Sequence, residues 1–199
     1  MTESDATRRP LALAITLIVT GLLGWYAAFA LTIDKILVLQ DPQADLDCNF
    51  SVIVQCGANL QSAQGSTFGF PNSLIGIAAF VAPIAVGVAI LAGAQFARWF
   101  WIALNLGVTG ALGFCIWLMA QSIFVLGTLC PWCMVVWAAT IVMFWTLTLF
   151  NARAGAFGVP LVRVGSALYS WVPIIVFASY LIIAIIAQVR LDLLSFLLV

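Results

Sequence analysis

Five long apolar runs dominate the chain and leave few folds open to it. They cover residues 11–33, 73–93, 99–125, 131–150 and 168–187. A helix that crosses a membrane needs about 20 predominantly apolar residues, and each run is that long. The short alternating segments of about 10 residues that build a membrane β-barrel are not visible. The sequence therefore predicts an all-α integral membrane protein with five transmembrane helices.

The amino-acid composition excludes several classes of function. Charged residues make up 7% of the chain, whereas soluble domains carry roughly 25%. Seven basic and seven acidic residues give no net charge, so no basic surface is expected that would bind nucleic acid. The chain has no histidine, which excludes histidine-bound haem, histidine-based zinc or copper sites, and histidine bases. Its five cysteines remain as the candidates for chemistry.

Basic residues in the loops predict the orientation. In a five-helix count one side of the membrane receives Arg8, Arg9, Arg98, Arg153 and Arg163, and the other receives only Lys35 and Arg190. Positive loops stay in the cytoplasm. We therefore expect residues 1–10 as a cytoplasmic N-terminus, 11–150 as a four-helix bundle, 151–167 as a cytoplasmic loop, and 168–199 as a fifth helix with an external C-terminus. Residues 28–30 resemble a signal-peptidase site, but an uncleaved first helix is favoured because the apolar run is too long for a signal peptide.

The predicted external loop between the first two helices is unusually long. It spans residues 40–72, whereas helix-to-helix connections usually take 2–8 residues. The loop is polar, yet it contains Cys48 and Cys56, and residues 58–64 are able to form a short helix. We expect a lid over the outer end of the bundle. A polar linker stapled by one disulfide is the alternative.

A second cysteine pair, Cys130-Pro131-Trp132-Cys133, stands at the predicted outer start of the fourth helix. Proline favours the first helical position, so Cys130 is expected near the N-cap and Cys133 in the first turn. The free backbone N–H groups and the helix dipole there favour a thiolate. This predicts a redox-active pair. Zinc is a competing use of four cysteines, although the spacing is not typical of zinc sites, and inert structural disulfides are another.

Both pairs are expected on the external side, where disulfides persist and can exchange through a mixed disulfide. Cys133 lies about one helical turn deeper than Cys130, roughly 4.5 Å, and is better placed to meet an acceptor in the membrane. A quinone fits, because it needs only an apolar pocket with a few hydrogen-bond donors. Aromatic residues near the outer helix ends are candidates to line that pocket: Trp117, Phe124, Trp132 and Trp137.

Two further residues have open roles. Asn72 follows Pro71 at the expected start of the second helix, where it can cap that helix or offer its amide to a quinone oxygen. Cys115 is expected inside the third helix as a small buried apolar residue.

The order of these motifs resembles the vitamin K epoxide reductase family. The resemblance rests on Cys48-x7-Cys56, Ser62, the segment Phe68-Gly69-Phe70-Pro71-Asn72-Ser73, and Cys130-x-x-Cys133. Disulfide generators of the DsbB type carry the C-x-x-C motif in the first external loop, whereas here it comes in the second. The resemblance covers about residues 11–150.

The resemblance implies a four-helix bundle around a quinone, capped by the loop between the first two helices. By resemblance, Cys48 and Cys56 form the shuttle pair, Cys56 exchanges with Cys130, and Cys133 contacts the quinone. It further implies that Ser62 supports the relay and that Asn72 binds a quinone carbonyl. Vitamin K epoxide reductases proper have a tyrosine where this chain has Trp137, which weakens the case for epoxide reduction. Bacterial relatives often carry a fused thioredoxin-like domain, which the 199 residues do not contain.

Together these features predict a disulfide-forming oxidoreductase of the bacterial plasma membrane. It would oxidise a separate, external thioredoxin-fold protein of the DsbA-like kind and reduce menaquinone, ubiquinone or a vitamin K type quinone. The alternative is a non-enzymatic transporter or scaffold subunit with structural disulfides. Transport pathways usually carry intramembrane charges, and the five runs contain almost none apart from Asp34 and Lys35 near an end.

Overall fold

Five helices in the structure, a computed structural model that describes residues 10–192, are long and apolar enough to cross a membrane. Within these residues the chain forms helices and no strands, which confirms the predicted fold class. The long helices are α1 (Leu11–Gln40), α3 (Asn72–Leu91), α4 (Arg98–Ala120), α5 (Pro131–Arg153) and α7 (Val172–Leu191). A π-helical turn, Gln121–Leu126, continues α4 toward α5.

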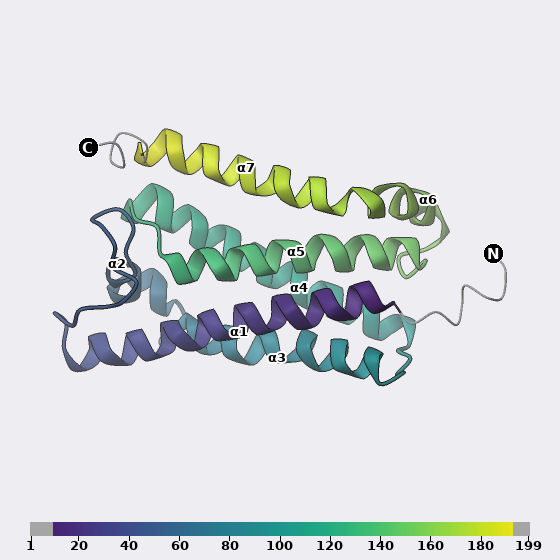
Figure 1. Cartoon of the computed structure of the whole chain (residues 1–199), viewed down its shortest axis with the longest axis horizontal. Coiled ribbons are helices and arrows are strands. Elements are labelled where there is room, and N and C mark those ends of the chain that lie inside the picture. The colour runs from purple at the N-terminus through teal and green to yellow at the C-terminus, as the bar shows by residue number, and fades with distance from the viewer. Residues whose placement is uncertain (1–9, 193–199) are drawn as a thin grey trace.

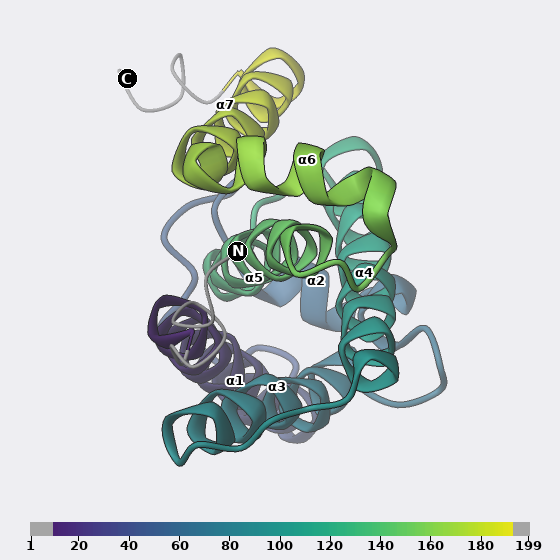
Figure 2. The same cartoon turned by 90° about the vertical axis from the view of Figure 1, so that its right-hand side faces the viewer.

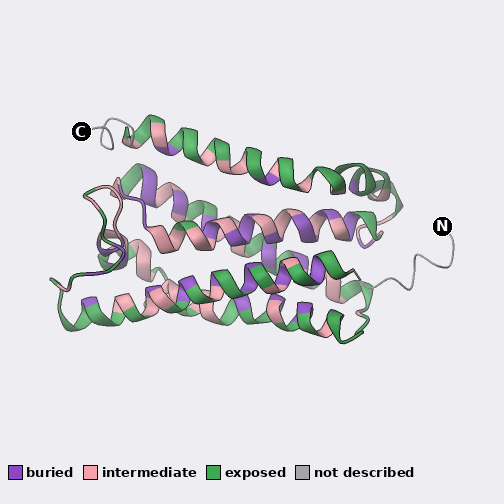
Figure 3. Ribbon diagram, in the orientation of Figure 1, coloured by how far each residue is buried: buried purple, intermediate pink, exposed green. Residues whose placement is uncertain are grey.

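Helices α1, α3, α4 and α5 form a bundle, and α7 lies outside it against α5 (Figure 2). Leu13, Leu17 and Leu147 are fully buried in its core. Gly87 of α3 allows a close approach to α1, because a Cβ atom there would lie 2.8 Å from the carbonyl oxygen of Ala14. The outer faces of the helices are also apolar but are exposed, as Figure 3 shows most clearly for α7. These faces would contact lipid.

The two ends of the bundle differ in charge. The start of α1 and the end of α7 lie at opposite ends of the molecule (Figure 1), as a chain with five crossings requires. Arg98, Arg153 and Arg163 stand at the end where α4 begins and α5 finishes, whereas Lys35 and Arg190 belong to the other end. Arg8 and Arg9 lie outside the described residues. The predicted segregation of basic residues is therefore present in the described part, and the assignment of that end to the cytoplasm stays a prediction.

Helix α1 is longer than predicted. The expected span ended at residue 33, but the helix continues to Gln40, so Asp34 and Lys35 lie inside it and not at its end. Four apolar residues, 36–39, follow the charged pair and carry the helix onward. It ends where Pro42 disfavours a helical conformation for Asp41, which is extended at φ −138°.

The predicted loop 151–167 also contains regular structure. Helix α6 (Val159–Leu168) begins with Pro160 in its first turn, a favoured position for proline, and a 3₁₀ turn, Tyr169–Trp171, joins it to α7. Gly165 allows this helix to pack against the end of α5, because a Cβ atom there would clash with the backbone of Ala152 and Arg153. The sequence prediction missed α6 because this 10-residue helix is much shorter than the roughly 20 apolar residues by which a membrane span is recognised, so most of it was assigned to the loop.

The lid, residues 41–71, lies over one end of the bundle. It contains α2 (Gly57–Gln61) and a 3₁₀ turn, Ala63–Ser66, close to the short helix expected at residues 58–64. Ser62 separates the two turns, and its hydroxyl accepts a hydrogen bond from the Gly65 amide. The lid therefore has local structure of its own and is not a plain linker.

Candidate functional site

Cys48 and Cys56 form a disulfide within the lid. Both residues are buried, at 2% and 0% exposure. The side-chain oxygen of Asn49 accepts hydrogen bonds from the backbone amides of Cys56, at 3.0 Å, and Gly57, at 3.2 Å. These two bonds satisfy amides at the start of α2 and hold Cys56 in place. The pairing implied by the family resemblance is thus present.

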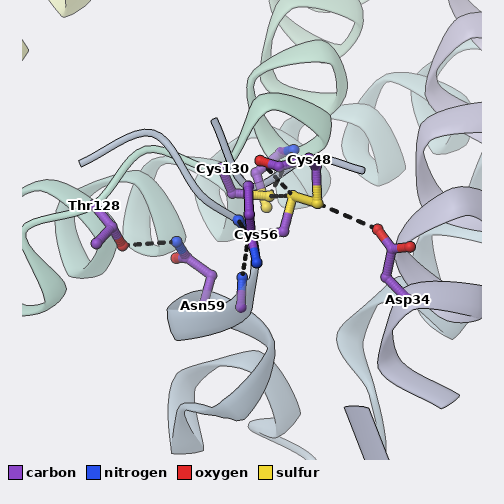
Figure 4. Close-up of a disulfide and its surroundings, with 9 residues drawn as sticks. Asp34, Cys48, Cys56, Asn59, Thr128 and Cys130 are labelled. Atoms are coloured by element: carbon purple, nitrogen blue, oxygen red, sulfur yellow. Dashed lines mark hydrogen bonds between the residues drawn. A yellow bond between two sulfur atoms is a disulfide. The ribbon is translucent and has the colours of Figure 1, made fainter. Parts of the chain in front are cut away.

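Cys130 lies at the N-cap of α5, as the sequence predicted, with Pro131 directly after it. Its sulfur accepts a hydrogen bond of 3.3 Å from the Cys133 amide and lies 3.4 Å from the sulfur of Cys56 (Figure 4). Cys130 and Cys133 are free thiols in this structure. Two cysteines 74 residues apart in the sequence therefore stand in position for disulfide exchange.

Backbone pairing holds the lid against the segment that carries Cys130. Val54 and Leu129 form a parallel bridge: the Gln55 amide donates to the Leu129 carbonyl at 3.0 Å, and the Leu129 amide donates to the Ile53 carbonyl at 2.7 Å. The Asn59 side chain also donates to the Thr128 hydroxyl at 2.9 Å (Figure 4). These bonds explain why the Cys56 and Cys130 sulfurs meet.

A cavity of about 490 Å³ lies inside the four-helix bundle beneath the lid. Apolar residues form most of its wall, and polar residues at the lid end include Lys35, Asn59, Ser62, Gln64, Asn72 and Gln121. Cys133 lines the same cavity, while Cys130 does not. The C-x-x-C pair therefore links the lid disulfide to the cavity.

The predicted aromatic wall is present only in part. Trp137 lines the cavity and is 5% exposed. Trp117 does not line the cavity. Its ring is 39% exposed and stacks on Phe114, which does line it. The remaining two candidates, Phe124 and Trp132, also lie outside the lining. Phe114 and Trp117 are three residues apart on α4 and their rings stack on the same side of the helix, but only Phe114 reaches the cavity.

Asn72 and Ser62 both line the cavity but have local partners. Asn72 does not cap α3, so that alternative is wrong; its amide donates to the Gln64 carbonyl at 2.6 Å and accepts from the Thr67 amide at 3.1 Å. The same Nδ2 atom of Asn72 also makes a longer contact of 3.5 Å to the Thr67 hydroxyl. Ser62 donates to the Asn59 carbonyl at 2.7 Å. Both residues therefore hold the lid in shape at the cavity mouth.

Three polar or thiol groups at the site were not predicted. A carboxylate oxygen of Asp34 lies 3.4 Å from the sulfur of Cys48, and the Lys35 ammonium donates to the Leu60 carbonyl in the lid at 2.5 Å. The only signal for these two residues in the sequence was the presence of charges in an apolar run. Cys115 is buried as expected, but it also lines the cavity near Thr140.

Comparison with known proteins agrees with this geometry. The model of the vitamin K epoxide reductase family matches residues 15–148, which include most of α1, the lid, both cysteine pairs and most of α5. A search of curated proteins finds no match. The matched region is the bundle that encloses the cavity, and it leaves α6 and α7 outside. The chain is a membrane thiol oxidoreductase by this relationship, and it belongs to the vitamin K epoxide reductase family.

Proposed function

We propose that the protein moves electrons from an external thiol protein to a membrane quinone and thereby forms disulfide bonds. One observation carries the proposal. The Cys48–Cys56 disulfide, the Cys130 sulfur at 3.4 Å from Cys56, and Cys133 in the cavity wall form a continuous path from the lid to the bundle interior. A structural disulfide would have no need of a free thiol in contact with it.

The order of steps follows from the contacts. A thiolate of the donor attacks Cys48, and Cys56 leaves as a thiolate, because Cys56 is the sulfur that faces Cys130. Cys56 then attacks Cys130 in an oxidised C-x-x-C pair and displaces Cys133 as a thiolate. Cys133 is the better electron donor to the cavity, since it lines the wall and Cys130 is covered by the lid.

The cavity fits a quinone head group. Its volume of about 490 Å³ lies within the range of about 300–1,000 Å³ usual for small-molecule sites, and its wall is largely apolar. Asn72 would bind a quinone carbonyl through its weakly engaged N–H, and Trp137 would pack against the ring. When bound, a menaquinone, ubiquinone or vitamin K type quinone would accept two electrons and two protons from the C-x-x-C dithiol.

The donor would be a separate thioredoxin-fold protein of the DsbA-like kind, and the lid end would face the outside of a bacterial plasma membrane. Phe50 and Val52 support a protein donor, because these large apolar side chains stand 73% and 76% exposed on the lid beside the buried disulfide. Ser62 supports the relay by capping the turn next to α2. Trp117 has no assigned role, because it lies outside the cavity.

The test is quinone reduction by purified protein in lipid nanodiscs. With dithiothreitol as the donor and short-chain analogues of menaquinone and ubiquinone as acceptors, we expect quinol formation by the unaltered protein and none by Cys133→Ala. That variant should also accumulate a Cys56–Cys130 disulfide, detected by thiol alkylation and mass spectrometry. Cys115→Ala is the matched control, because Cys115 lines the same cavity outside the relay, and it should keep its activity. Full activity of Cys133→Ala would refute the proposed path.

A further inference from the structure

Asp34 is an acidic residue in the apolar helix α1, and its carboxylate faces the relay. Its Oδ2 atom lies 3.4 Å from the sulfur of Cys48, and one ligand atom from each of Asp34, Cys48 and Cys56 lies within 4.8 Å of the other two (Figure 4). Within residues 10–192 the Asp34 side chain makes no other hydrogen bond or ion pair. A carboxylate placed against a disulfide sulfur gains nothing from it, because that sulfur carries no proton.

The contact becomes useful when Cys48 is a thiol. Cys48 then has an S–H that can donate to the carboxylate, and the two groups form a proton-transfer pair. The lid pair is asymmetric in this respect, since Cys48 faces Asp34 and Cys56 faces Cys130, each at 3.4 Å. The sulfur that must exchange with the C-x-x-C pair is thus separated from the sulfur that must gain and lose a proton.

We propose that Asp34 is the catalytic base that deprotonates Cys48 when the lid disulfide re-forms. This inference rests on the proposed function. After the donor leaves, Cys48 is a thiol and Cys56 is bonded to Cys130. Cys48 passes its proton to the Asp34 carboxylate and attacks Cys56, the Cys48–Cys56 bond forms, the Cys56–Cys130 bond breaks, and the electron pair leaves on Cys130 as a thiolate. The structure has the bonding of the product, a lid disulfide with Cys130 and Cys133 as thiols.

The negative charges near Cys48 make it unfavourable to form a free thiolate before the attack. They favour transfer of the Cys48 proton to Asp34 at the same time as the sulfur attacks. Asp47 in the lid acts on Asp34 through its charge, and Lys35, the next residue, directs its ammonium to the Leu60 carbonyl. Two carboxylates near Cys48 disfavour an isolated thiolate there. The proton should therefore leave Cys48 for Asp34 as the sulfur attacks. Asp34 would return it to Cys48 when the next donor molecule releases that sulfur.

The experiment needs no quinone. Protein oxidised at both pairs receives dithiothreitol, is quenched with an alkylating reagent at set times, and is analysed by mass spectrometry for the Cys56–Cys130 species. Asp34→Asn should prolong the lifetime of this species by up to about 30-fold at pH 7 and about fourfold at pH 8, because an ordinary thiol of pKa about 8.5 is only partly ionised at these values. Asp34→Glu should restore most of the rate.

The controls separate this inference from the proposed function. Asp45→Asn removes an exposed carboxylate of the lid that makes no hydrogen bond with Asp34 or the cysteines, and it should leave the lifetime within about twofold. Equal helicity and thermal unfolding of the variants will show that they fold alike. A lifetime in Asp34→Asn that equals or falls below that of the unaltered protein, or one with the same pH dependence, would overturn the role of Asp34. Failure of the unaltered protein to transfer electrons from dithiothreitol to Cys130 and Cys133 would instead overturn the relay itself.

Discussion

Replacing Asn49 with alanine should loosen the lid around Cys56, because one side-chain oxygen holds two backbone amides. The two hydrogen bonds measure 3.0 and 3.2 Å. A hydrogen bond contributes about 0.5–1.5 kcal/mol net, and the lower half of that range applies to an exposed side chain such as Asn49. Loss of both bonds should therefore lower the free energy of local lid opening by about 1–2 kcal/mol. This corresponds to about 5- to 30-fold more frequent opening of this part of the lid.

Two measurements check the predicted increase in lid opening. Hydrogen–deuterium exchange of a peptide that contains Cys56 and Gly57 should accelerate by about 5- to 30-fold. Reduction of the Cys48–Cys56 disulfide by dithiothreitol should accelerate by the same factor, because both cysteines are buried and the reagent reaches them only after the lid opens.

Asn49→Asp provides the matched control, since aspartate keeps the accepting oxygen at the same position and its charge is exposed to solvent. It should exchange and react at the rate of the unaltered protein. Unchanged exchange in Asn49→Ala, or an equal acceleration in Asn49→Asp, would refute the reasoning that these two bonds hold the lid.

Two further predictions concern the bundle. Gly87→Ala should lower the free energy of unfolding by about 1–3 kcal/mol, because its Cβ would lie 2.8 Å from the Ala14 carbonyl oxygen. Gly110→Ala is the control, and it should be neutral or stabilising because the space around Gly110 is open. Thermal unfolding in detergent measures both variants. Ala111→Trp should abolish quinone reduction but leave transfer from the lid to Cys130 intact, because Ala111 lines the cavity. The same change at the exposed Leu106 of α4 should affect neither activity.

The sequence determined the class of structure and the chemistry, because both depend on local properties of the chain. Apolar runs about 20 residues long predict membrane helices wherever they occur. The position of Cys130 at a helix start follows from Pro131 alone, and the absence of histidine restricts the chemistry to thiols. The sequence did not reveal α6, because a helix of 10 residues is too short to be recognised as a membrane span.

Only the tertiary structure decided which groups meet. The contact of Cys56 with Cys130 depends on an isolated backbone bridge between the lid and the segment before α5, and neither segment has a sequence pattern that predicts the pairing. Which aromatic residue faces the cavity depends on helix rotation, so Trp137 lines it and Trp117 does not. Asp34 looked like the end of a helix, yet α1 continues past it and brings its carboxylate to Cys48. Such pairings join residues far apart in the chain, and their geometry is set by the packing of whole helices and not by sequence spacing.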